Sequence, residues 1–291
     1  MKMNKEGFIT VVAIFIGFLA LAIPSYTWTQ ENVKELARWH NSKLSPVIMI
    51  PGSSASQNRF DGLVKKINSQ GQKHHSLLKV KVYNDGTIKY TGKIDRKDNE
   101  PFIVVGFENN KDGYSNILKQ AKMFNKVFEQ LTTRYEFNNF KAFGHSNGGL
   151  IYTAFLEKYL SNYDVRAKVL MTVGTPYNFS ETSLQRKTQM LADFIKDRNN
   201  LPKDLIVYTV AGTETYDSDG LVPERSVEAG KYIYQGVVKS FTQITVTGED
   251  AQHSDLPQND EIISLIKRYV LEQNPNQNQD QKSKKLKENS Q

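Results

Sequence analysis

Residues 140–160 read FKAFGHSNGGLIYTAFLEKYL and contain the most specific motif of the chain. A short apolar strand predicted over residues 140–143 leads into Gly144-His145-Ser146-Asn147-Gly148, which has the Gly-x-Ser-x-Gly form, and a helix is predicted over residues 150–160. A serine on such a strand-to-helix turn is held with its hydroxyl exposed, and the helix N-terminus directs backbone N–H groups toward a developing oxyanion. We therefore expect Ser146 to be a nucleophile; the alternative is a glycine-rich turn with a solvated serine.

A nucleophilic serine needs a base, and the base needs a carboxylate that orients it. In the α/β-hydrolase arrangement the three residues follow in the chain order serine, acid, histidine. His253 is the only histidine after the serine, so it is the expected base. The acid is expected within residues 211–220, where Asp219 precedes a compact turn that would fix its carboxylate, and Asp217 and Glu214 remain alternatives.

Two backbone N–H groups are expected to form an oxyanion hole for the intermediate. One belongs to Asn147, the residue after the nucleophile. The other is expected in the Pro51-Gly52-Ser53-Ser54 loop, which ends an early strand; Ser53 is the expected donor and Ser54 is the alternative. Tyr177 follows the end of another strand, and it is expected either to line a substrate pocket or to be a buried aromatic residue.

Apolar strands alternate with amphipathic helices along the middle of the chain. This alternation predicts an α/β fold with a mostly parallel central sheet and helices on both faces. Asn84-Asp85-Gly86 between two strands indicates a small β-hairpin insertion, because glycine accepts a positive φ, and the polar residues 180–204 are compatible with a small lid. The strands are predicted at residues 46–50, 78–83, 87–91, 102–107, 140–143, 167–173, 205–211 and 241–246, and two further helices at residues 117–131 and 261–271.

Taken in order, the motifs of the chain resemble those of a known family. They are the Pro-Gly-Ser-Ser loop, the hairpin turn, the serine turn, Gly174-Thr175-Pro176 and Ser218-Asp219-Gly220-Leu221-Val222-Pro223. Over about residues 45–272 the series is similar to α/β-hydrolases that Gram-positive bacteria export, which are often labelled cell surface hydrolases. The resemblance implies the α/β-hydrolase fold, and it places the nucleophile, the acid and the base on the serine, aspartate and histidine chosen above. The chain departs from the family at Pro51-Gly52, where the family usually has His-Gly, so the loop geometry and the substrate preference stay open.

The two ends of the chain differ in composition from its middle. Lys2 and Lys5 precede an uncharged, mostly apolar run over residues 8–23, so residues 1–28 are predicted to be a signal peptide or a membrane anchor. Either one implies an extracytoplasmic protein at the cell surface, membrane-anchored or secreted. Residues 29–272 are predicted to form the α/β-hydrolase domain, and residues 273–291 are predicted to be a disordered polar tail.

The composition narrows the chemistry further. The 291 residues include five histidines and no cysteine. The absence of cysteine excludes thiol nucleophiles, disulfides and cysteine-based metal sites. The formal net charge of +7 fits an anionic surface such as phospholipid or a cell-wall polymer, although basic proteins without such a partner are as common. We see no nucleic-acid-binding motif. The expected triad needs no cofactor and no metal.

These observations lead us to expect a serine hydrolase that cleaves carboxylic esters, as lipases and esterases do. It would form an acyl-enzyme intermediate outside the cytoplasm. Export and positive charge suggest a lipid or an acylated cell-wall polymer as the ester substrate, and the membrane is a partner if the N-terminal segment is not cleaved. Two alternatives stay open, which are an acyltransferase that uses the same triad and a non-catalytic cell-surface binding module.

Overall fold

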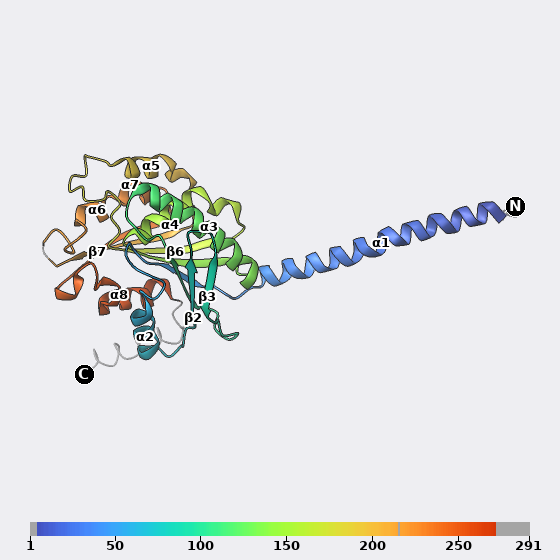
Figure 1. Cartoon of the computed structure of the whole chain (residues 1–291), viewed down its shortest axis with the longest axis horizontal. Helices are drawn as coiled ribbons and strands as arrows, with labels where there is room; N and C mark the ends of the chain where they lie inside the picture. Colours follow the sequence, from blue (N-terminus) through green and yellow to red (C-terminus); the bar gives the residue numbers. More distant parts are fainter. Residues whose placement is uncertain (1–4, 215, 272–291) are drawn as a thin grey trace, which may run out of the picture. The chain divides into compact units, whose positions relative to one another are not determined.

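The computed structural model describes residues 5–214 and 216–271. The chain divides into two compact units, one up to Lys43 and one from Leu44 onward. The first unit is the helix α1 (Lys5–His40; Figure 1), in which Val12–Lys34 is apolar enough, at a mean hydropathy of 1.7, and long enough to cross a membrane. The boundary predicted between residues 28 and 29 lies inside this helix. The predicted tail at residues 273–291 lies outside the described residues.

The second unit is built on an eight-stranded sheet with the strand order β3-β2-β4-β1-β5-β6-β7-β8. Every neighbouring pair is parallel except β2 and β3, which form the antiparallel hairpin predicted from the Asn-Asp-Gly turn. The elements are, in chain order, β1 (Val47–Ile50), α2 (Asp61–Gln70), β2 (Leu77–Val82), β3 (Ile88–Gly92), β4 (Phe102–Phe107), α3 (Tyr114–Tyr135), β5 (Asn139–His145), α4 (Asn147–Lys158), β6 (Arg166–Val173), α5 (Gln189–Asp197), β7 (Ile206–Thr213), α6 (Glu224–Glu228), α7 (Lys231–Tyr234), β8 (Ser240–Thr247) and α8 (Asp260–Leu265), which continues as a π-helical turn over Ile266–Val270.

Two hydrophobic cores lie on the two faces of the sheet. Successive residues of a strand point to opposite faces, so Ile48 and Ile50 of β1 belong to one core, whereas Val47 and Met49 belong to the other. Figure 1 shows α3, α4, α5 and α7 over one face and α2 and α8 over the opposite face. The predicted parallel sheet covered on both faces is therefore confirmed, and it explains why the central strands are uninterrupted apolar runs.

Residues 180–204, for which a lid was expected, contain the helix α5. Its residues Met190, Leu191 and Phe194 are buried in the same core as the apolar side chains of α4. Thr188 begins the helix, because its hydroxyl oxygen accepts a hydrogen bond from the N–H of Leu191. The segment thus contributes a helix that packs into the core of the domain.

The strand order defines where a ligand is expected. From β1 the chain passes to β2, β3 and β4 on one side of the sheet and then returns to β5 on the other side of β1. The direction of winding changes between β1 and β5, and open α/β sheets bind ligands outside the carboxyl ends of the strands at this point. The loop after β1 and the turn after β5 meet there.

Candidate active site

Ser146 lies at the turn between β5 and α4. Its backbone has φ 54° and ψ −127°, a conformation that non-glycine residues rarely adopt and that is characteristic of strained functional turns. The turn is tight, because a Cβ atom on Gly144 would lie 2.6 Å from the backbone nitrogen of Gly149. The local sequence therefore folds into the sharp strand-to-helix turn that the Gly-x-Ser-x-Gly motif predicts, with the serine directly before the helix.

Asp219 and His253 form a hydrogen-bonded pair at the same edge of the sheet. The Asp219 Oδ2 atom lies 2.6 Å from Nδ1 of His253. The other carboxylate oxygen, Oδ1, accepts hydrogen bonds from the backbone N–H groups of Leu221 (3.1 Å) and Val222 (2.7 Å). The carboxylate is thus buried and held from both sides, and the compact turn after Asp219 fixes it in the manner expected from the sequence.

The two alternative acids lie elsewhere. The side chains of Glu214 and Asp217 are exposed, and Glu214 Oε1 accepts a hydrogen bond from Gln252 at 2.8 Å. Neither carboxylate is hydrogen-bonded to the imidazole ring. Of the three candidates on this loop, the structure pairs only Asp219 with His253.

The serine and the histidine approach each other around Gly174. The backbone N–H of Ser146 donates to the carbonyl of Val173 at 2.9 Å, and a Cβ atom on the next residue, Gly174, would lie 3.1 Å from His253 Nδ1. Both side chains are among the described residues, and the Ser146 hydroxyl makes no hydrogen bond to the ring of His253 in this structure. In ligand-free enzymes this contact is often long and shortens when the substrate binds.

The backbone N–H groups close to Ser146 differ in whether they are already hydrogen-bonded, and this bears on the expected oxyanion hole. The loop after β1 lies directly against the nucleophile, since a Cβ atom on Gly52 would be 2.5 Å from Cβ and 3.1 Å from Oγ of Ser146. The N–H of Ser54 is already bonded to the carbonyl of Asn110 at 3.0 Å. The N–H of Ser53 has no hydrogen-bond partner among the described residues, and neither has that of Asn147. The geometry therefore favours Ser53 over Ser54 as the second donor.

His145 contacts His253, the candidate base, which the sequence did not indicate. Its Nε2 atom lies 2.9 Å from the main-chain oxygen of His253, and the two ring centroids are 4.8 Å apart. Burial lowers the pKa of His145 well below its usual range, and the proximity of His253 and Arg59 lowers this pKa further. His145 is therefore neutral, and its Nε2 carries the hydrogen because a carbonyl can only accept.

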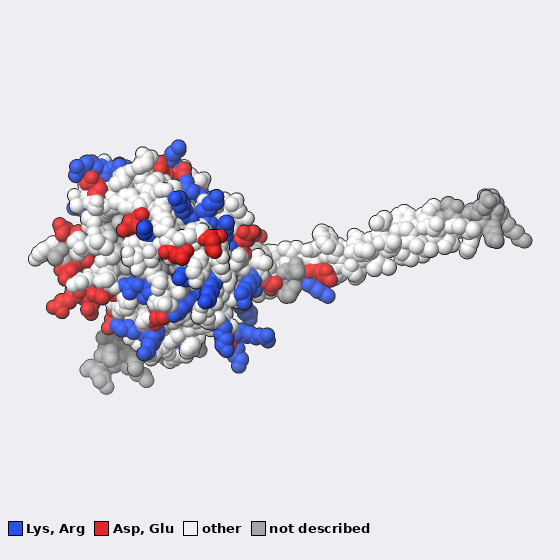
Figure 2. Space-filling view, in the orientation of Figure 1, with Lys and Arg blue, Asp and Glu red and all other residues white. Residues whose placement is uncertain are grey.

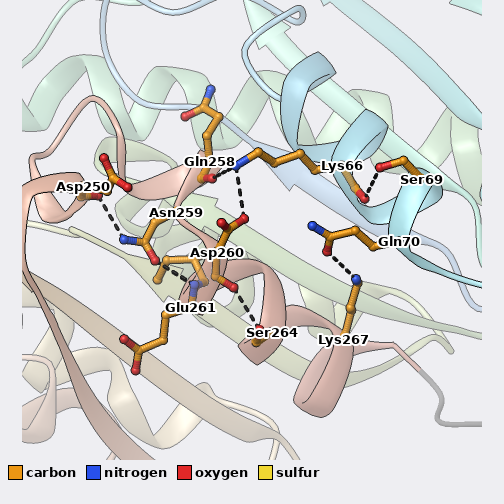
Figure 3. A network of polar contacts seen from close by, with 11 residues as sticks. Lys66, Ser69, Gln70, Asp250, Gln258, Asn259, Asp260, Glu261, Ser264 and Lys267 are labelled. Carbon is orange, nitrogen blue, oxygen red and sulfur yellow. Dashed lines mark hydrogen bonds and ion pairs between the residues drawn. The ribbon is translucent and has the colours of Figure 1, made fainter.

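Further contacts hold the loop that carries His253. The N–H of His253 donates to the main-chain oxygen of Asp219 at 2.8 Å, and the Arg59 guanidinium donates to the carbonyl of Ser254. Figure 3 shows how the far end of this loop is tied to α2. There Lys66 Nζ contacts the carbonyl of Gln258 (3.0 Å) and the Asp260 carboxylate (3.1 Å). The candidate base His253 thus lies on a loop that is held by contacts with several elements.

The expectation that Tyr177 lines a substrate pocket is wrong. Its side chain is completely buried in the core, and its hydroxyl contacts those of Thr172 (3.0 Å) and Tyr234 (3.3 Å). Burial raises the pKa of Tyr177 to about 12. The strand end does lie at the catalytic edge, but its tyrosine turns inward, as the alternative interpretation allowed.

A cleft of about 310 Å³ lies beside His253, the candidate base. It is lined by Glu214, Asp219, Gly220, Leu221, Gln252, His253 and Ser254. Leu221 is largely exposed, so the cleft offers one apolar side chain among mainly polar groups. Within residues 5–214 and 216–271, no group of three or more His, Asp or Glu side chains is arranged to hold a metal ion.

Comparisons with known proteins agree with this fold. A family described as alpha/beta hydrolase of unknown function matches residues 35–273. The chain belongs to this α/β-hydrolase family. A search of curated proteins finds no match.

Two solved structures are similar to this member of the family. One is named a putative cell surface hydrolase from Lactobacillus plantarum WCFS1; it is 52% identical, covers 83% of this chain and 98% of its own, and has a TM-score of 0.74. The other is a gene product of Listeria innocua with 27% identity, coverage of 79% and 96%, and a TM-score of 0.69. The family resemblance and the α/β-hydrolase fold expected from the sequence are both confirmed.

Proposed function

We propose that the protein is a serine hydrolase that cleaves carboxylic esters. In this proposal the Ser146 hydroxyl attacks the ester carbonyl, and His253 takes its proton and returns it to the leaving alcohol. Asp219 holds the imidazole in the required tautomer. Water then releases the acyl group from the serine with His253 again acting as the base.

The observation that carries the proposal is the pair formed by Asp219 and His253. A buried carboxylate bonded to Nδ1 leaves the opposite ring nitrogen, Nε2, as the one that can accept a proton. The strained turn at Ser146 and the two unbonded N–H groups of Ser53 and Asn147 support the same chemistry, since an acyl transfer needs donors at the developing negative charge.

We also propose that the enzyme works outside the cytoplasm, at the cell surface, either anchored by α1 or secreted after cleavage. The apolar stretch Val12–Lys34 supports this location, as does the name of the similar Lactobacillus protein, a cell surface hydrolase. If α1 is retained, the membrane is a partner of the chain. Access of an external protease to the domain in intact cells tests the location, and protection of the domain from the protease would contradict it.

The test of the chemistry uses the full-length protein in a mild detergent with p-nitrophenyl esters of increasing acyl length. We expect Ser146→Ala to lower kcat by about 10⁶-fold and Asp219→Asn to lower it by about 10⁴-fold. Asp217→Asn is the matched control, because Asp217 is exposed on the same loop, and it should leave kcat unchanged. Equal rates for Asp219→Asn and Asp217→Asn would contradict the proposed acid, and wild-type rates for Ser146→Ala would contradict the proposed reaction.

A further inference from the structure

A second concave site lies at some distance from the candidate triad, between the β2–β3 hairpin and α3. It is a groove of about 340 Å³. Val82, Ile88 and Met123 give it an apolar floor, and the side chains of Asn84, Asn109 and Asn116 add amide groups. Lys119, Lys122 and Lys126 complete the lining. We call these three residues the lysine row.

The lysine row occupies one side of α3. The spacing of three and four residues places the side chains on one face of the helix, and all three are exposed. Among the described residues they make no ion pair and no hydrogen bond. Like charges at these spacings destabilise a helix slightly, so a bound anion would relieve an electrostatic cost.

Little in the groove offsets this positive charge. Among the described residues that line it, Asp85 is the one acidic side chain against three lysines, and the nearby Glu108 uses Oε2 to accept a hydrogen bond from the N–H of Asn84 at 2.8 Å. The excess extends to the surroundings, because residues 73–134 include twelve Lys and Arg and seven Asp and Glu. Figure 2 shows Lys and Arg over the part of this face that holds α3 and the hairpin, with several Asp and Glu among them, and a cluster of Asp and Glu over the part near α6.

The groove lies at the same edge of the sheet as the candidate nucleophile. Val82 is the last residue of β2, and Asn109 follows the end of β4. In the strand order β2-β4-β1-β5, three strand spacings separate β2 from β5, which ends next to Ser146. At roughly 4.8 Å per spacing this is roughly 14 Å. An extended polymer of a few repeating units would reach from the groove to the serine.

We propose that the lysine row binds the phosphate groups of an anionic phosphodiester polymer, and that the polymer presents an ester on a neighbouring unit to Ser146. Ammonium groups bind phosphate as point charges without a fixed geometry, which suits a polymer that slides along the groove. Binding of the polymer is independent of the triad; only the statement about its ester rests on the proposed function. A polymer engages several lysines at once and gains affinity over free phosphate.

Binding is tested with the full-length protein in a neutral detergent and with long-chain inorganic polyphosphate as the probe. We expect Lys119→Gln/Lys122→Gln/Lys126→Gln to weaken binding at least about tenfold at low salt. The slope of log affinity against log salt should fall by roughly two. The control is Lys196→Gln/Lys203→Gln/Lys239→Gln, which removes the same charge from exposed lysines outside the groove. It should change the affinity for polyphosphate less than about twofold. Equal losses in the two triple variants would overturn the proposal.

Two further arms separate the possible outcomes. Micelles of the same neutral detergent that contain anionic phospholipid are the second probe: if they bind through the lysine row and polyphosphate does not, the ligand is a lipid headgroup and the polymer proposal fails. Ser146→Ala should bind polyphosphate like the wild type, so a failed triad and a failed groove give different results. The groove variant should also hydrolyse neutral p-nitrophenyl acetate at the wild-type rate, which shows that the fold is intact.

Discussion

The Nε2 atom of His145 lies 2.9 Å from the main-chain oxygen of His253, and the planes of the two rings are inclined by 36°. The residue immediately before the candidate nucleophile therefore holds the loop of the candidate base. The contact joins the serine turn to a loop that is more than a hundred residues away in the sequence, and it links the two segments that would exchange a proton in the proposed reaction.

This contact predicts that His145 is a positioning residue. His145→Leu removes the donor and leaves the part-buried carbonyl of His253 without it, which costs about 1 kcal/mol or more, so we expect kcat/KM for an ester to fall about tenfold. His145→Gln keeps an N–H donor at a similar reach and should restore most of the rate. Because His145 is neutral, the shape of the pH–rate profile should be the same in wild type and His145→Gln. Wild-type kcat/KM in His145→Leu would contradict this role.

Gly52 is expected to tolerate no side chain. In Gly52→Ala the new methyl group would lie 2.5 Å from Ser146 Cβ, so the loop must move away from the nucleophile and take the Ser53 N–H with it. Displacing one oxyanion donor should lower kcat about 10²-fold or more. This loss is measured as the rate of ester hydrolysis. Gly62→Ala is the matched control, because its methyl group meets only Gln258 Cγ at 3.7 Å. The control should keep full activity and should stabilise α2 by about 0.5–1 kcal/mol; equal activities of the two variants would show that Gly52 does not shape the site.

The buried carboxyl group of Glu157 leads us to predict that the stability of the folded protein depends on pH. Glu157 is buried in α4, and neither of its carboxylate oxygens has a hydrogen-bond partner among the described residues. Burial, aided by the charge of Asp197, raises the pKa of Glu157 from 4.5 to about 9. The folded protein thus keeps a proton that the unfolded chain has released above pH 4.5. Stability should therefore fall as the pH rises toward 9 and should change little from this group at higher pH.

The measurement is urea unfolding of the full-length protein at several pH values, followed by near-UV circular dichroism of the tyrosines. Tryptophan fluorescence would not report on the domain, because Trp28 and Trp39 both lie in α1. We expect Glu157→Gln to remove most of the decline between pH 5 and 9, since the amide cannot ionise. Glu129→Gln, at an exposed position of α3, should retain it. A decline of the same size in Glu157→Gln would contradict the assignment.

Much of the fold could be predicted from the sequence, because a parallel sheet that is covered on both faces leaves a simple pattern. The strand β4 was predicted over residues 102–107 and spans Phe102–Phe107, all of it buried. The helix α2 was missed, because only Leu63, Val64 and Ile67 are buried in its ten residues and so short a pattern is weak. The helix α1 continues past the predicted boundary, because the boundary was placed near the end of the uncharged run, whereas the following turns mix charged residues with Val33, Leu36 and Trp39 and remain helical.

The candidate site could be predicted where its signal is local or where few residues compete. Ser146 follows from one motif, and His253 follows from the scarcity of histidine. Contacts between residues far apart in the sequence could not be predicted, such as that of Arg59 with the carbonyl of Ser254. Tyr177 was misplaced because position at a strand end does not determine the direction of a side chain.

Covalent labelling with a fluorophosphonate probe tests the central claim most directly. The full-length protein is treated with the probe, digested, and the modified peptide is identified by mass spectrometry. We predict one adduct, on the Oγ atom of Ser146, that is absent in Ser146→Ala and forms at least about 10²-fold more slowly in His253→Ala. A modification on another residue, or labelling of Ser146→Ala to the wild-type extent, would contradict the assignment of Ser146 as the nucleophile.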